Sequence, residues 1–277
     1  NIHTSQYEFQ LSPNLTIILV SGSHKNSLTH LLKTQDKIAT AIINMLKKSP
    51  DYFAALEKGM QSFQKKQYKT AMKHLKTLAS IGDPDGLYNL GVFYEPGLGV
   101  NKDDKQAYKH YSLAAVTGHR FAINNLASFY MEGRGVKKNE KTAARLYAQA
   151  GKMGVAVAQN AIGNMLFKGI GIEQNIPAAE QWLLLAAAQG FKPATKTLLE
   201  LYDGEIKKNN NEAIHAKAMV YLRGIGVKPD PDKAIKLLEK GAFVGLKKSR
   251  MALIKLYKEG LFGVEKNAEK ATFWEQQ

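Results

Sequence analysis

The chain has 277 residues, of which 44% are hydrophobic and 23% charged, a balance typical of globular proteins rather than of disordered or membrane-spanning chains. Lysine and arginine number 39 against 24 aspartates and glutamates, and the resulting net charge of +15 predicts attraction to acidic partners. The absence of cysteine excludes disulfides, thiolate metal sites and cysteine nucleophiles. The longest apolar stretch, residues 182–188, is far too short for a membrane span.

The first 53 residues stand apart from the rest of the sequence. Thr16 to Val20 is short and rich in branched residues, which predicts a strand. An amphipathic helix is then predicted, which begins after Ser27, stops before Pro50 and has this apolar stripe: Leu28, Leu31, Leu32, Ile38, Ile42 and Leu46. We expect this helix to cap the region that follows, because the end of a repeat array needs a cover for its apolar face.

From residue 54 onward, a repeat of 36 residues runs through the chain. Its glycine turn occurs at residues 97–100, 133–136, 169–172 and 224–227, and loosely at residues 260–263. Two further columns keep the same register. A small residue recurs at Ala71, Ala107, Ala143, Ala179 and Ala234, and a closing glycine at Gly82, Gly118, Gly154, Gly190 and Gly245. Repeats of this length indicate stacked supersecondary units.

Apolar residues within each unit follow helical spacing, so two helices per unit are predicted. Leu90, Gly91 and Tyr94 belong to a first helix, and Ala107 and Tyr111 to a second. With its glycine turn and the Ala114-Ala115-x-x-Gly118 ending, the unit resembles the Sel-like repeat, a relative of the tetratricopeptide repeat. The resemblance implies an all-α fold, an α/α solenoid in which helix pairs stack into a right-handed superhelix.

The predicted organisation is an N-terminal segment with a capping helix over residues 1–53, followed by a solenoid over residues 54–277. Between Gly190 and Gly245 the spacing is 55 residues rather than 36. We therefore expect an irregularity near residues 203–212, with an exposed polar loop from Lys207 to Asn211.

The sequence lacks the constellations that catalysis requires. The seven histidines form no metal-binding pair, the Gly-x-Gly turns join helix to helix rather than strand to helix, and no Gly-x-Ser-x-Gly motif is present. Asp103 and Asp104 suit the start of a second helix and need no catalytic role. We expect no enzyme activity, no cofactor and no metal.

The predicted function is a protein-binding scaffold or adaptor that holds its partner on the concave face of the solenoid. The resemblance implies a role in the bacterial envelope or in host interaction, with the bacterial enhanced-entry proteins as possible relatives. Two other interpretations stay open: binding or modification of cell-wall glycan, and nucleic-acid binding, which the placement of most aromatic residues in core columns disfavours. We expect a monomer that is periplasmic or secreted after upstream processing, with the cytoplasm as the alternative.

The candidate binding residues lie on the stripe of each first helix opposite its packing stripe. Asparagine recurs there although it is a mediocre helix former, which suggests a row of amides that bind a partner's backbone. The candidates are Tyr88, Asn89, Val92, Asn124, Asn125, Ser128, Asn160, Asn164, His215, Met219 and Lys255.

Overall fold

The computed structural model describes residues 5–12, 15–21 and 50–277. Strands β1 (Ser5–Ser12) and β2 (Leu15–Ser21) form an antiparallel hairpin that pairs Ser5 with Ser21 and shifts its register between Gln10 and Ser12. The strand predicted at residues 16–20 is thus confirmed within β2. The capping helix predicted from Leu28 to Leu46 lies outside the described residues.

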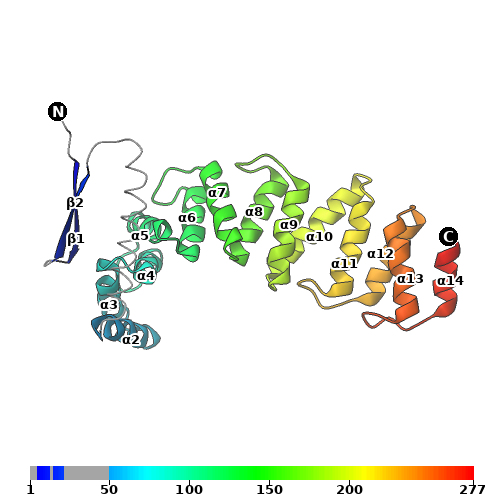
Figure 1. Cartoon of the computed structure of the whole chain (residues 1–277), viewed down its shortest axis with the longest axis horizontal. Helices are drawn as coiled ribbons and strands as arrows, with labels where there is room; N and C mark the ends of the chain where they lie inside the picture. Colours follow the sequence, from blue (N-terminus) through cyan, green and yellow to red (C-terminus); the bar gives the residue numbers. More distant parts are fainter. Residues whose placement is uncertain (1–4, 13–14, 22–49) are drawn as a thin grey trace. The chain divides into compact units, whose positions relative to one another are not determined.

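Thirteen helices account for most of the described part of the chain from residue 50 onward (Figure 1). They divide between two compact units that meet in sequence between Asn139 and Glu140. The first unit contains α2 (Pro50–Gln64), α3 (Tyr68–Ser80), α4 (Pro84–Tyr94), α5 (Asp104–Val116) and α6 (Arg120–Glu132). The second contains α7 (Glu140–Lys152), α8 (Ala156–Lys168), α9 (Ile176–Ala188), α10 (Lys192–Lys207), α11 (Glu212–Arg223), α12 (Pro231–Phe243), α13 (Lys247–Glu259) and α14 (Ala268–Gln276). The predicted all-α solenoid fold is confirmed for these residues.

Within each of the two compact units, consecutive helices pack against one another through residues of the predicted repeat columns. The five alanines of the small-residue column are all fully buried. On the facing first helices, Gly91 and Gly163 leave room for the large side chain of the second helix, since a Cβ on Gly163 would lie 2.8 Å from Cγ of Leu183. Small residues therefore let the paired helices approach closely, and one large side chain fills the space between them.

Polar caps fix where the second helices begin. Asp103 accepts hydrogen bonds from the backbone N–H of Lys105 and Gln106 at 2.9 and 3.0 Å, as expected for an N-cap. Asn175, Asp230 and Asn267 occupy the same position before α9, α12 and α14, and each caps its helix with one such bond. The acidic pair at residues 103 and 104 is thus explained by helix capping.

The second glycine of each turn packs closely against the start of the helix that precedes its repeat. A Cβ on Gly135, whose φ is +64°, would lie 2.7 Å from the carbonyl carbon of Asp104 at the start of α5. Gly99 meets the start of α3 at Tyr68 and Lys69 in the same way, and Gly171 meets the start of α7 at Glu140. Successive helix pairs are therefore placed by direct backbone contact, for which only glycine has room.

The 55-residue spacing corresponds in the structure to one additional helix, α10. Only the turn at Lys208–Asn211 separates α10 from α11, and Asn209 adopts a left-handed conformation with a φ of +64°. A Cβ on Gly226, from the next glycine turn, would collide with the side chain of Thr195 at the start of α10. In Figure 1, α10 lies between α9 and α11. Thus α10 follows α9 as a first helix would, yet it receives the glycine turn as a second helix does.

This double role changes the direction of the helices that follow. Each short turn reverses the chain, so α11 runs antiparallel to α10, although both have the sequence of a first helix. Consecutive first helices α8 and α10, with α9 between them, run in the same direction. The row of first helices therefore continues through α10 and is interrupted between α10 and α11, which separates the candidate residues of α8 from those of α11.

We predict that Gly135→Ala destabilises the fold by more than the ~1 kcal/mol that a positive φ alone costs an alanine. Gly118→Ala is the matched control, because Gly118 also has a positive φ (+82°) but a Cβ there would meet no atom within 4 Å. Thermal unfolding followed by circular dichroism measures both variants. Equal melting temperatures would show that the contact with Asp104 does not constrain the stack.

Candidate functional site

The candidate residues of the first helices occupy the border between core and surface. Lys255 is exposed, and all the others are partly buried, so none is consumed by the core. Tyr88, Asn89 and Val92 lie on α4, Asn124, Asn125 and Ser128 on α6, Asn160 and Asn164 on α8, His215 and Met219 on α11, and Lys255 on α13. Their role in binding stays a prediction, and their surroundings differ from helix to helix.

A polar network joins α4, α5 and α6 around Glu95. The Tyr111 hydroxyl donates a hydrogen bond to Oε2 of Glu95 at 2.6 Å, and Arg134 Nη1 donates to Oε1 of the same carboxylate at 2.7 Å. The Asn125 side chain acts on the hydroxyls of both Tyr88 and Tyr111, where it works to lower their pKa. Two of the candidates, Tyr88 and Asn125, therefore lie together beside a half-buried ion pair.

Arg134 is held in place from several sides. Its Nε lies 2.7 Å from a Glu132 carboxylate oxygen, and its guanidinium carbon lies 4.2 Å from the centre of the Phe129 ring. Ser128, another candidate, donates to the second oxygen of Glu132 at 3.0 Å. These contacts fix the side chain while a quarter of it stays exposed, so Arg134 is a preorganised group whose charge is matched by Glu95 and Glu132.

The network shifts the protonation equilibria of its members. Burial, together with the hydrogen bond and the charge of Glu95, raises the pKa of Tyr111 well above its ordinary value, and burial and Glu95 also raise the pKa of Tyr88. Burial works to lower the pKa of Arg134, but the hydrogen bond and charge of Glu95 outweigh it and raise that pKa. The tyrosines therefore stay neutral hydrogen-bond donors, and the arginine stays charged.

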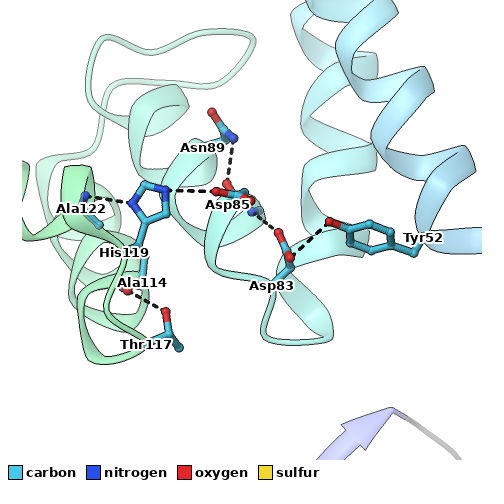
Figure 2. Close-up of polar contacts among 9 residues, drawn as sticks. Tyr52, Asp83, Asp85, Asn89, Ala114, Thr117, His119 and Ala122 are labelled. Carbon is cyan, nitrogen blue, oxygen red and sulfur yellow. Dashed lines mark hydrogen bonds and ion pairs between the residues drawn. The ribbon is translucent and has the colours of Figure 1, made fainter. Parts of the chain in front are cut away.

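A second polar cluster, around His119, links α4 to α6 (Figure 2). His119 Nδ1 accepts a hydrogen bond from the backbone N–H of Ala122 at 3.1 Å, and so the ring caps α6. Nδ1 is thereby used as an acceptor, so Nε2 carries the proton that is donated to Asp85 at 3.1 Å. The ring also stacks on Tyr88 with the centres 4.4 Å apart. His119 thus holds the ring of the candidate residue Tyr88 in place by stacking on it.

On α8 the amides bond largely to one another. Asn164 Nδ2 donates to the backbone carbonyl of Asn160 at 2.9 Å and to its side-chain oxygen at 3.2 Å, and Thr197 donates to Asn164 Oδ1 at 3.4 Å. On α6, by contrast, Oδ1 of Asn124 is buried and accepts no hydrogen bond, while its amide nitrogen donates to Asn125. Asn124 therefore keeps an unused acceptor.

Three candidates meet in one hollow between α11 and α13. His215, Met219 and Lys255 line a space of about 530 Å³ together with residues of α13. His215 Nδ1 lies 3.1 Å from the hydroxyl of the buried Ser249, and burial, aided by the charge of Arg223, lowers the pKa of the ring. The lowered pKa favours the neutral form of the imidazole. The ring is part of the wall of the hollow.

Other candidates are not brought together with these. Asn89 and Val92 line a separate, apolar hollow of about 220 Å³ between α2, α3 and α4, whose floor includes Leu75 and Phe93. Asn160 and Asn164 line neither hollow. The single continuous row of amides that the sequence suggested is thus divided among distinct local surfaces.

Metal ligands do not cluster in the part of the chain that the structure describes, where no three His, Cys, Asp or Glu side chains lie close enough to hold an ion. Among the described helices, none is both long and apolar enough to cross a membrane.

Comparison with known proteins places this architecture in a family. The sequence profile of the Sel1 repeat matches residues 84–115, 120–155, 156–191, 216–242 and 249–276, which together make up more than half of the chain. The chain belongs to the Sel1 repeat family. A Sel1 repeat protein from Oxalobacter formigenes, known from its crystal structure, shares 30% sequence identity over 80% of this chain and 95% of that one, with a TM-score of 0.50.

Two further solved structures are similar at lower TM-scores. One is a protective antigen of uropathogenic Escherichia coli strains that displays an SLR fold. It shares 27% sequence identity over 76% of this chain and 48% of that chain, with a TM-score of 0.48. Cysteine-rich protein B of Helicobacter pylori is 27% identical over 44% of this chain and 93% of that chain, with a TM-score of 0.34. A search of curated protein sequences found no match. Sel1 repeat proteins are generally protein-interaction scaffolds and typically lack enzyme activity.

Sequence reasoning missed the residues that hold the Sel1 units together at this surface. Glu95 lies outside the 36-residue columns and Arg134 occupies the variable position of its glycine turn, so nothing in the repeat pairs them. A signal for His119 was present, because it directly follows a closing glycine, where Asp83 stands one unit earlier and caps α4 through the Gly86 N–H at 2.7 Å. The residue after the closing glycine caps the next first helix at Asp83 and His119, whereas Val155, Phe191 and Leu246 at the same position make no side-chain cap.

We predict that Tyr111 makes stability fall at alkaline pH. A tyrosine whose pKa is raised in the folded state contributes fully below the unfolded value of about 10, and its contribution is lost as pH rises above that value. In urea titrations at about pH 9 and about pH 11, Tyr111→Phe should lose less free energy of unfolding between the two pH values than the wild type, by about 1 kcal/mol. Identical pH dependence of the two proteins would contradict the buried Tyr111–Glu95 bond.

Proposed function

We propose that this Sel1 repeat protein is a non-catalytic scaffold that binds a protein partner along its first helices, on the concave face of the solenoid. The observation that carries the proposal is the partly buried polar stripe on α4, α6, α8 and α11, whose residues border the surface without filling the core. Extended repeat surfaces of this kind suit a long partner segment better than a small substrate.

The geometry of α4 to α6 supports binding that costs little conformational entropy. Tyr88, Asn125 and Arg134 are already fixed by contacts within the chain, so a partner need not immobilise them. Preorganised side chains reduce the entropic cost of association.

A triple variant, Asn124→Ala, Asn160→Ala and Asn164→Ala, tests this proposal. We expect the fold to survive and the affinity for the native partner to fall at least tenfold, which corresponds to about 1.4 kcal/mol. The partner is first captured from the native cells with the wild-type chain and identified by mass spectrometry. Its affinity for both proteins is then measured by titration calorimetry.

The matched control removes three exposed amides that lie off the first helices: Asn101, Gln149 and Gln181. Their replacement by alanine should leave the affinity unchanged. If the folded first-helix variant binds the partner as tightly as the wild type, the first helices do not form the binding surface.

We also propose that the scaffold acts in the bacterial envelope or at the host interface, as a periplasmic or secreted protein. A chain of 277 residues without cysteine is compatible with an oxidising compartment, where free thiols are a liability. Immunoblotting of cytoplasmic, periplasmic and secreted fractions from the native cell should find the protein outside the cytoplasm. Recovery with cytoplasmic markers alone would refute this placement.

A further inference from the structure

The hollow between α11 and α13 combines an apolar floor with a basic rim. Its volume is about 530 Å³, and its apolar lining comes from Met219, Met251, Ala252 and Ile254. Met251 is 58% exposed although it lies in the middle of a helix, so a large apolar side chain is left uncovered here. Methionine is flexible and polarisable, which allows such a floor to adapt to different apolar side chains.

The rim carries an excess of positive charge. Helix α13 has one acidic residue, Glu259, and five basic residues: Lys247, Lys248, Arg250, Lys255 and Lys258. Two of the three lysines that line the hollow already have partners within the chain, Lys248 with Glu212 and Lys258 with Glu275. Lys255 forms no ion pair with any described residue, and it is an exposed residue of the lining.

We propose that this hollow binds an acidic peptide segment of the partner, with an apolar side chain on the methionine floor and a carboxylate at Lys255. The inference rests on the proposed scaffold function and adds the chemistry of the bound segment. Charge complementarity selects it, because Lys255 is the lining lysine without an ion-pair partner and helix α13 carries five basic residues against one glutamate.

The two kinds of contact contribute differently. Ion pairs at an exposed rim are individually weak, so the carboxylates serve mainly to select the sign of the partner and to speed association. Most of the affinity must come from covering Met251 and filling the space beside Met219, since burial of apolar surface is the larger favourable contribution. Loss of Lys255 should therefore change selectivity, and loss of Met251 should change affinity for any peptide.

The shape of the hollow favours a peptide over other anionic partners. Of the apolar lining residues only Met251 is exposed and the others are partly buried, whereas insertion into a lipid surface needs a broad apolar face that protrudes. No phenylalanine, tyrosine or tryptophan lines the hollow, and its one aromatic ring, that of His215, is bonded to Ser249 in the wall, so the stacking surface that single-stranded nucleic acid requires is lacking. A peptide side chain can enter the hollow while its neighbours reach the lysines.

Selection of random peptides displayed on phage against the full chain tests the inference. We expect the selected peptides to be enriched in aspartate and glutamate close to an apolar residue, so that the apolar side chain can enter the hollow while a carboxylate reaches Lys255. A selected peptide, synthesised with a fluorescent label, then serves as the probe in anisotropy titrations. Its affinity should fall at least tenfold for Lys255→Glu, and at least as much for Met251→Ala.

Lys236→Glu supplies the matched control, because it makes the same charge change at an exposed position of the second helix α12. Its affinity for the probe should remain within twofold of the wild type. Circular dichroism and thermal unfolding establish that all three variants are folded.

The inference is overturned if no peptide is selected, if the selected peptides lack acidic residues, or if Lys255→Glu binds the probe as tightly as the wild type. Binding of phosphatidylglycerol vesicles or of single-stranded DNA that Lys255→Glu abolishes, without peptide binding, would assign the rim to a lipid or nucleic acid instead. If the asparagine triple variant loses the native partner while Lys255→Glu retains it, the scaffold function stands and the acidic-peptide site falls.

Discussion

The contact between the second glycine of each turn and the start of an earlier helix is the constraint on which the rest of the structure depends. At Gly135 and Gly171, a Cβ would lie within 2.7 Å of the backbone of α5 and of α7, respectively. Because backbone meets backbone, these contacts allow little variation in how one helix pair follows another. The buried alanine column and the large second-helix side chains complete the packing around that contact.

The same constraint explains the region around α10. The turn that contains Gly226 still requires the start of a helix to pack against, and the start of α10, at Thr195, provides it where a second helix is missing. The chain thereby keeps its packing rule and gives up the regular alternation of first and second helices. One consequence is functional, since the first helices before and after α10 no longer form one uninterrupted row. The hollow between α11 and α13 is then a surface of its own, with a charge and an apolar floor that α8 does not share.

Most of the fold could be predicted because the repeat expresses it as periodic residue types. Alanine columns, closing glycines and capping residues such as Asp103 each follow from local geometry that recurs every 36 residues. The candidate site was harder to predict from the sequence, since the stripe opposite the core indicates only which residues the core does not use. Whether an amide is available to a partner depends on its neighbours: Asn164 is satisfied by Asn160, and the side-chain oxygen of Asn124 is buried without a hydrogen bond. The Glu95–Arg134 pair and the joint role of His215, Met219 and Lys255 arise from distances between units, which a repeat alignment does not contain.

The most direct test of the account is to find which helices touch the partner. A photo-crosslinking aromatic amino acid can replace exposed residues of first helices, Phe121, Val157 and Met251, and exposed residues of second helices, Lys109, Gln149 and Lys236. Illumination of each variant bound to its native partner, followed by mass spectrometry, reports the contacts. We expect crosslinks from the first-helix positions and none from the second-helix positions. Crosslinks confined to the second helices would contradict it.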